Sequence, residues 1–129
     1  MKKIKIGDLE ISKFILGGNP FSGFSHQGSA QDQKMVDYYT TANIKKDLKK
    51  AESLGITTNI ARTDRHMSRV LHEYWKEGGS LQWIAQTCPE FTTIERSVET
   101  AAGNGASACY IHGGEMDNLY VNDKLEPVA

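Results

Sequence analysis

Hydrophobic and polar residues alternate along residues 2–12 of the chain. Isoleucine or leucine occupies positions 4, 6, 9 and 11, and Gly7-Asp8 lies between the two pairs. Alternation of this kind is typical of a strand with one buried face, and a Gly-Asp pair between two such strands is typical of a two-residue hairpin turn. We therefore expect a β-hairpin over residues 2–12.

After the hairpin, short apolar runs alternate with segments in which apolar residues recur every three or four positions. The short runs predict buried strands, and the longer spacing predicts amphipathic helices. The expected strands cover residues 14–16, 56–61, 81–87 and 106–112. The expected helices begin at Thr40-Thr41, at Asp64 and at Thr92, where Glu95 has capping-box spacing. Their apolar stripes include Ile44, Leu48, Ala51 and Leu54, then Met67, Val70, Leu71 and Tyr74, then Ile94, Val98 and Ala101.

Residues 21–33 are rich in Gly, Ser and Gln and show neither period. A stretch of this length without periodicity is expected to form a long loop, and long loops in compact domains are usually functional or disordered.

The order of the elements predicts a parallel α/β architecture. Strands alternating with helices favour right-handed crossovers, either in a doubly wound sheet or in a closed barrel. The turn after residues 14–16 reads Gly-Gly-Asn-Pro-Phe-Ser-Gly, which lacks the G-x-G-x-x-G spacing of nucleotide-binding doubly wound folds. We expect residues 1–129 to form one partial domain. It is the N-terminal half of a (β/α)8 TIM barrel with an opening β-hairpin and parallel strands alternating with helices.

A complete barrel of this kind needs about 250 residues. Asp123 and Pro127 are typical of the first turn of a further helix. The sequence is therefore expected to be a fragment of a longer barrel.

Composition narrows the class of partner. The formal net charge is -1, from 15 Lys+Arg and 16 Asp+Glu, so no nucleic-acid partner is expected. No apolar stretch has the length of a membrane span or of a signal peptide, and the 2 cysteines have no disulfide or CxxC pattern. We expect a cytoplasmic protein with a small-molecule substrate and no membrane partner.

In barrels of this type, functional residues follow the carboxyl ends of the strands. That rule selects residues after each of the four strands, and the site is assigned to His112 together with Asn19, Phe21, Arg62, Asp64, Gln86 and Glu115. The same strand ends also carry His26, His66, Thr87, Cys88, Glu90 and Asp117. Two interpretations of Arg62 stay open: a bidentate contact with a substrate phosphate or carboxylate, or a surface ion pair with Asp64. Two interpretations of Phe21 also stay open: an apolar wall of the pocket, or part of a plain turn.

Neither a nucleophilic cysteine nor a metal site is expected. Cys88 lies in no nucleophile motif, and we expect it to be a small buried residue. Asp64, His66, His112 and Glu115 are of metal-ligand type but form no diagnostic motif such as H-E-x-x-H, so no metal site is assigned.

Three segments carry a family resemblance. Residues 9–21, Leu-Glu-Ile-Ser-Lys-Phe-Ile-Leu-Gly-Gly-Asn-Pro-Phe, resemble the start of bacterial aldo-keto reductases. Residues 55–59, Gly-Ile-Thr-Thr-Asn, and residues 110–112, Tyr-Ile-His, resemble the start of their second strand and the end of their fourth. The resemblance implies that His112 is the active-site histidine that hydrogen-bonds the substrate carbonyl oxygen, where a neutral imidazole stabilises a developing alkoxide. A histidine with a structural role at the strand end is the alternative.

The other catalytic residues of that family have no match here. The position of the third-strand lysine falls at Gln86 or Thr87, and no matching tyrosine follows the second strand. The resemblance implies an NADP-dependent enzyme whose cofactor is held mainly by the second half of the barrel, so NADP is expected in the complete protein only.

We therefore expect an aldo-keto-reductase-like oxidoreductase that acts on a small carbonyl or alcohol substrate with altered catalytic residues. Two alternatives stay open. One is a metal-assisted or acid-base lyase or isomerase that uses His112 with Glu115, Asp64 or His66. The other is a non-catalytic barrel that binds a small metabolite.

Overall fold

The computed structural model describes residues 1–88, 90 and 92–121. The expected helix start at Asp123 lies outside the described residues. The described chain runs β1 (Lys3–Ile6), β2 (Leu9–Ser12), a 3-10 turn η1 (Pro20–Ser22), α1 (Ser29–Tyr38), α2 (Thr41–Ser53), β3 (Thr58–Arg62), α3 (Arg65–Lys76), β4 (Gln82–Gln86), α4 (Ile94–Gly103), β5 (Ala108–Tyr110) and α5 (Gly113–Val121).

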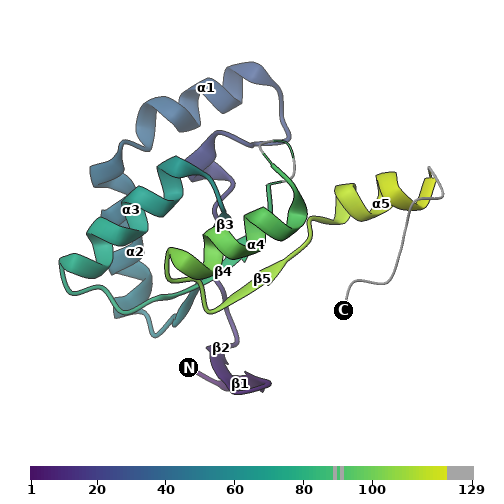
Figure 1. Ribbon diagram of the computed structural model, residues 1–129. Coiled ribbons are helices and arrows are strands. Elements are labelled where there is room, and N and C mark those ends of the chain that lie inside the picture. Colours follow the sequence, from purple (N-terminus) through teal and green to yellow (C-terminus); the bar gives the residue numbers. More distant parts are fainter. Residues whose placement is uncertain (89, 91, 122–129) are drawn as a thin grey trace.

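The expected parallel sheet is confirmed. Its order is β3-β4-β5, with both pairs parallel, and Leu16 adds a single parallel bridge to Asn59 on the other side of β3. Strand order therefore follows chain order without a reversal. The sheet is open over the described residues, with β5 at one edge (Figure 1). The single bridge of Leu16 lies at the other edge.

The opening hairpin is also confirmed. β1 and β2 pair antiparallel around Gly7, whose φ of 59° is the left-handed conformation that glycine adopts without strain. The hairpin meets the sheet where its strands begin, because Ser12 N donates to Thr57 Oγ1 and the Gln82 amide donates to the Glu10 carbonyl. In Figure 1 it lies beyond the end of the sheet opposite to α1.

Two of the three predicted helix starts are confirmed and one is wrong by a residue. Thr40 and Asp64 cap α2 and α3 by accepting from the backbone N–H groups three positions on. The cap of α4 is Thr93 and not Thr92, because Thr93 has the extended backbone that lets its hydroxyl accept from Arg96 N. The capping-box spacing from Thr92 to Glu95 thus selected the neighbouring residue.

Helices α2, α3 and α4 supply the core that covers one face of the sheet. Ile44, Leu48, Leu71 and Tyr74 are fully buried and belong to the same cluster as Trp83 of β4. Three expected stripe residues, Leu54, Ile94 and Val98, do not belong to this cluster. Leu54 follows the last turn of α2 and is 59% exposed, and Val98 is 40% exposed because the buried side of α4 carries Ser97 and Ala101.

Three further predictions are corrected. Part of the expected loop is helical, since η1 and the start of α1 fall within residues 21–33. The sequence of α1 has no apolar periodicity that would predict a helix, because the helix has no buried residue. Residues 14–16 contribute only the Leu16 bridge, and the run at 106–112 shortens to β5, after which α5 begins at Gly113.

Candidate functional site

A cavity of about 540 Å³ lies where the parallel strands end. Five of the predicted residues line it, from four separate segments of the chain: Asn19, Arg62, Gln86, His112 and Glu115. Four further lining residues lie at strand ends that the same rule selected: His26, Thr87, Glu90 and Asp117. The structure adds Phe24 and Gly114. The carboxyl ends of neighbouring parallel strands meet at one edge of a sheet, which is the physical reason why the strand-end rule found this region.

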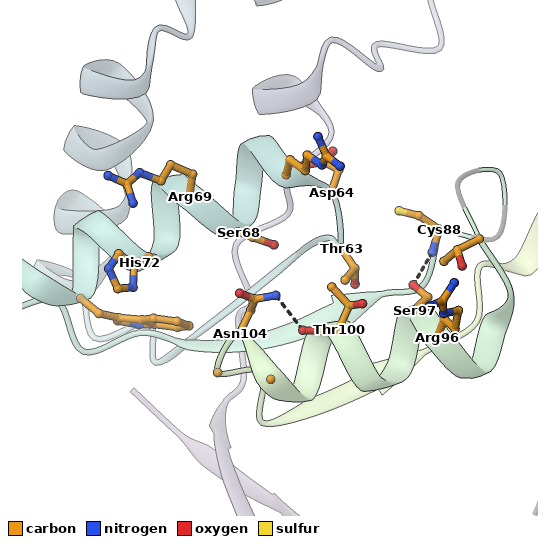
Figure 2. A pocket seen from close by; sticks show the side chains of 15 residues that line it. Thr63, Asp64, Ser68, Arg69, His72, Cys88, Arg96, Ser97, Thr100 and Asn104 are labelled. Atoms are coloured by element: carbon orange, nitrogen blue, oxygen red, sulfur yellow. Dashed lines mark hydrogen bonds between the residues drawn. The ribbon is translucent and has the colours of Figure 1, made fainter.

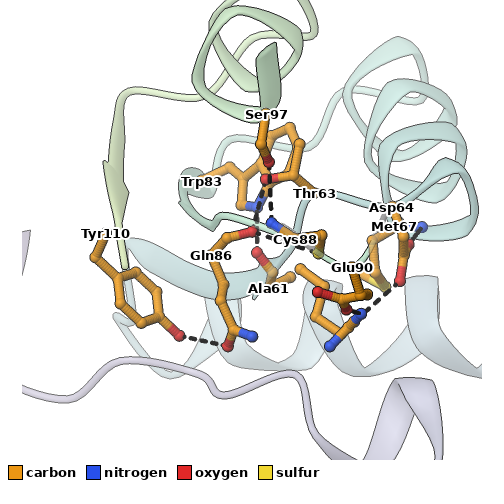
Figure 3. Close-up of polar contacts among 11 residues, drawn as sticks. Ala61, Thr63, Asp64, Met67, Trp83, Gln86, Cys88, Glu90, Ser97 and Tyr110 are labelled. Atoms are coloured by element: carbon orange, nitrogen blue, oxygen red, sulfur yellow. Dashed lines mark hydrogen bonds and ion pairs between the residues drawn. The ribbon is translucent and has the colours of Figure 1, made fainter. Parts of the chain in front are cut away.

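Strand register sets three side chains in a row on the sheet face opposite to the helices. Arg62 pairs with Gln86 across β3 and β4, and Gln86 pairs with Tyr110 across β4 and β5. The Tyr110 hydroxyl donates a hydrogen bond of 2.8 Å to Gln86 Oε1 (Figure 3). Tyr110 was not predicted, although its place two residues before His112 in an expected strand puts both on one face.

The Arg62 guanidinium is held from three sides. It forms an ion pair with Glu90, lies 3.5 Å from Asp64 Oδ2 through its Nε atom, and has its carbon 4.9 Å from the centre of the Phe24 ring. Burial by itself would lower the pKa of Arg62, but the hydrogen bond to Glu90 and the nearby negative charges raise it above its ordinary value. The cation is therefore a permanent feature of the site.

Asp64 and Phe21 lie outside the cavity. Asp64 caps α3 through Met67 N and braces Arg62, so it contributes by positioning the guanidinium. Phe21 is 4% exposed and packs edge-on against Tyr39 in the core, because the η1 turn directs it inward. The aromatic wall expected at Phe21 is supplied by Phe24.

His112 has a defined hydrogen-bonding role. Its Nδ1 atom accepts from Gly114 N at 3.1 Å. A nitrogen that accepts carries no proton, so in the neutral ring Nε2 carries the hydrogen and is the donor. Asn19 Nδ2 lies 3.3 Å from His26 Nε2, and His26 has a φ of 59°, in the left-handed region.

The cavity divides by charge. Its strand side carries the Arg62 guanidinium and the Gln86 amide, whose Nε2 has no acceptor among the residues that the structure describes. Its loop and helix side carries the carboxylates of Glu90, Glu115 and Asp117. The guanidinium and the amide thus come from the strands, and the carboxylates come from the segments that follow them.

A larger groove of about 1250 Å³ runs between α3 and α4 (Figure 2). It shares only Asp64 with the predicted site, and most of its lining comes from α3 and α4. Cys88 lies at its floor, where burial raises the pKa of the thiol. A thiol that stays protonated is a poor nucleophile, so the structural interpretation of Cys88 fits its surroundings.

Neither a metal group nor a membrane helix is found in the described part of the chain. No set of three or more His, Cys, Asp or Glu lies close enough there to hold a metal ion. No described helix combines the length and the apolar character needed to cross a bilayer.

Comparison with known proteins gives no match: no family model, no curated protein and no solved structure is similar to the chain at a significant level.

Proposed function

We propose that this chain is the first half of an aldo-keto-reductase-like (β/α)8 barrel, whose cavity binds a small carbonyl or alcohol compound. One observation supports the proposal most strongly. The Gly114 N–H orients His112 so that Nε2 is a donor, and His112 lines the same cavity as Gln86 and Arg62. The unreversed order of the sheet supports the barrel, because doubly wound sheets reverse their strand order at the ligand site.

The chemistry of such a site follows from its donors. A carbonyl oxygen within reach of His112 Nε2–H and of the Gln86 amide would be polarised, and negative charge developing on it would be stabilised. Glu115 and Asp117 line the same cavity and are the carboxylates placed to exchange a proton with a substrate hydroxyl. The proposed oxidoreductase would thus work without the family's tyrosine and lysine at their usual positions.

The nicotinamide cofactor implied by this proposal does not fit the described residues. The Gly17-Gly18 turn packs on β3, since a Cβ atom at Gly18 would lie 2.9 Å from the Ile60 carbonyl oxygen. Gly18 therefore serves close strand packing, and a Cβ atom at Gly17 would meet no atom within 4 Å, so neither glycine forms a cradle for a pyrophosphate. We derive no hydride-transfer step, and NADP binding is proposed for the complete barrel only.

The proposal is tested by titrating acetone and 2-propanol into isotope-labelled protein and following the side-chain resonances of His112 and Gln86 by NMR. We expect saturable shifts of both, and an approximately tenfold loss of affinity in His112→Ala, because the main donor to the oxygen is lost. His72→Ala is the matched control, since His72 lies in the α3–α4 groove. The proposal would be refuted if no cavity residue showed a resonance shift, or if His112→Ala bound the two compounds with the affinity of wild type.

An acid-base isomerase or lyase is the second candidate, favoured by the presence of Glu115 and Asp117 in the cavity of His112. It predicts proton exchange at the carbon next to a bound carbonyl with no nicotinamide present. Deuterium incorporation into acetone, measured in wild type and in Glu115→Gln, distinguishes it from the oxidoreductase.

A further inference from the structure

We infer that the cavity contains a carboxylate subsite formed by Arg62 and Gln86, that Glu90 occupies it in this structure, and that the ligand is a small 2-oxo or 2-hydroxy acid whose carboxylate takes the place of Glu90. The inference rests on the proposed function and names the substrate class of the same cavity.

The ion pair of Arg62 and Glu90 is asymmetric. The Arg62 side chain is 18% exposed and fixed by Asp64 and by the Phe24 ring, whereas the Glu90 side chain is 48% exposed. An exposed carboxylate is released into water at small cost, while the guanidinium stays where the protein holds it. Glu90 thus shows that this edge of Arg62 accepts a carboxylate, and it is an occupant that a ligand can displace.

Tyr110 determines which end of the Gln86 amide faces the ligand. Its hydroxyl donates to Gln86 Oε1, so the oxygen is engaged and the Nε2 group is left to donate. Register places this amide directly beside Arg62. One carboxylate oxygen can then accept from the guanidinium and the other from the amide, as in planar carboxylate recognition.

The remaining charges of the cavity favour a carboxylate over a phosphate. Glu115 and Asp117 line the same space as Glu90, and the described lining has Arg62 as its one guanidinium. Repulsion grows with the charge of the ligand, so a dianion is disfavoured more than a monoanion. With the carboxylate on Arg62, a neighbouring oxo or hydroxyl oxygen is left for His112 Nε2–H, which gives the 2-oxo or 2-hydroxy acid.

The first experiment removes the internal occupant. Pyruvate, lactate and inorganic phosphate are titrated separately into wild type, Glu90→Gln and Glu99→Gln, with binding followed by NMR. A tethered carboxylate competes at an effective concentration in the millimolar range, so we expect Glu90→Gln to bind pyruvate roughly five- to tenfold more tightly. Glu99→Gln removes the same charge from an exposed position of α4 and should match wild type. Unchanged pyruvate affinity in Glu90→Gln, or tighter binding of phosphate than of pyruvate, would overturn the inference.

The second experiment tests Tyr110 as a positioning residue. Tyr110→Phe frees the Gln86 amide to rotate, so we expect pyruvate to bind roughly threefold to tenfold more weakly. Acetone, whose oxygen has His112 as its main donor, should lose less affinity than pyruvate, a split that a general loss of structure would not produce. Equal losses for the two compounds would contradict the role of Tyr110.

The outcomes separate the two proposals. If acetone shifts His112 while Glu90→Gln leaves pyruvate binding unchanged, the carboxylate subsite is wrong and the proposed function stands. If neither compound shifts any cavity resonance, the proposed function itself fails.

Discussion

Individual polar residues in this molecule act through a few short hydrogen bonds whose loss can be measured. Tyr74 is the clearest example in the core. Its hydroxyl donates to Glu52 and accepts from Ser80 N and Leu81 N, although its ring is fully buried. The hydroxyl therefore joins α2, α3 and the segment that enters β4.

Tyr74→Phe is expected to lower the free energy of unfolding by about 2 kcal/mol, because the buried Leu81 N–H loses its acceptor. Denaturant unfolding followed by circular dichroism measures the change. Tyr38→Phe is the matched control, since Tyr38 is 61% exposed and should change stability by less than about 0.5 kcal/mol. Equal effects of the two variants would contradict this role of the hydroxyl.

A pH dependence follows from Asp32. Ser25 donates to Asp32 Oδ1 through both its hydroxyl and its backbone N–H, at 2.6 and 2.7 Å, and these bonds lower the pKa of the carboxyl. A group whose pKa is depressed in the folded state contributes stability above its unfolded pKa, and that contribution is lost as pH falls through the folded pKa. The link between residue 25 and α1 is therefore expected to weaken in acid.

Ser25→Ala removes the hydroxyl donor, so the pKa of Asp32 should rise toward its ordinary value. The carboxyl carbon shift followed by NMR against pH measures it. Asp37 serves as the internal reference, and a pKa of Asp32 that stays as low as in wild type would show that another contact is responsible.

At the scale of elements, the caps decide where helices begin. Thr93→Ala is expected to destabilise the protein by about 1 kcal/mol, because Arg96 N loses its acceptor. Thr92→Ala is the control and should change the free energy of unfolding by only a few tenths of that. Thermal unfolding of both variants measures the difference. The reverse ranking would restore Thr92 as the cap.

At the scale of the whole molecule, the sheet has one covered and one open face. Trp83 and Ala85 lie under the helices, so the alternating neighbour Ile84 faces the other way and is only half-buried, as is Ile60 beside it. The edge of β5 is also open over the described residues. Open edges and apolar faces favour association of chains.

We expect the 129-residue chain to associate reversibly with increasing concentration, and Ile84→Lys to reduce that association severalfold. Sedimentation velocity over a tenfold or wider concentration range measures it. Val98→Lys changes an apolar residue on the helical side and should leave association unchanged. A monomer at all concentrations would show that this face is stable in water.

Much of the fold was predictable because its signals are local. Residues only a few positions apart predict the hairpin and the helix caps at Thr40 and Asp64. The parallel order of the strands follows from the alternation of strands with helices. The strand-end rule also placed Arg62, Gln86 and His112 around one cavity. α1 was not predicted, because a helix without a buried face has no apolar periodicity in its sequence.

The sequence by itself determined the period of each segment, since hydrogen bonds within a turn and the burial of one face depend on nearby residues. Tertiary structure alone decided which aromatic residue, Phe24 or Phe21, faces the cavity, and it brought Glu90 onto Arg62, 28 positions away. It also set Tyr110 against Gln86. The reason is that such contacts depend on the register and approach of separate elements, which no local pattern encodes.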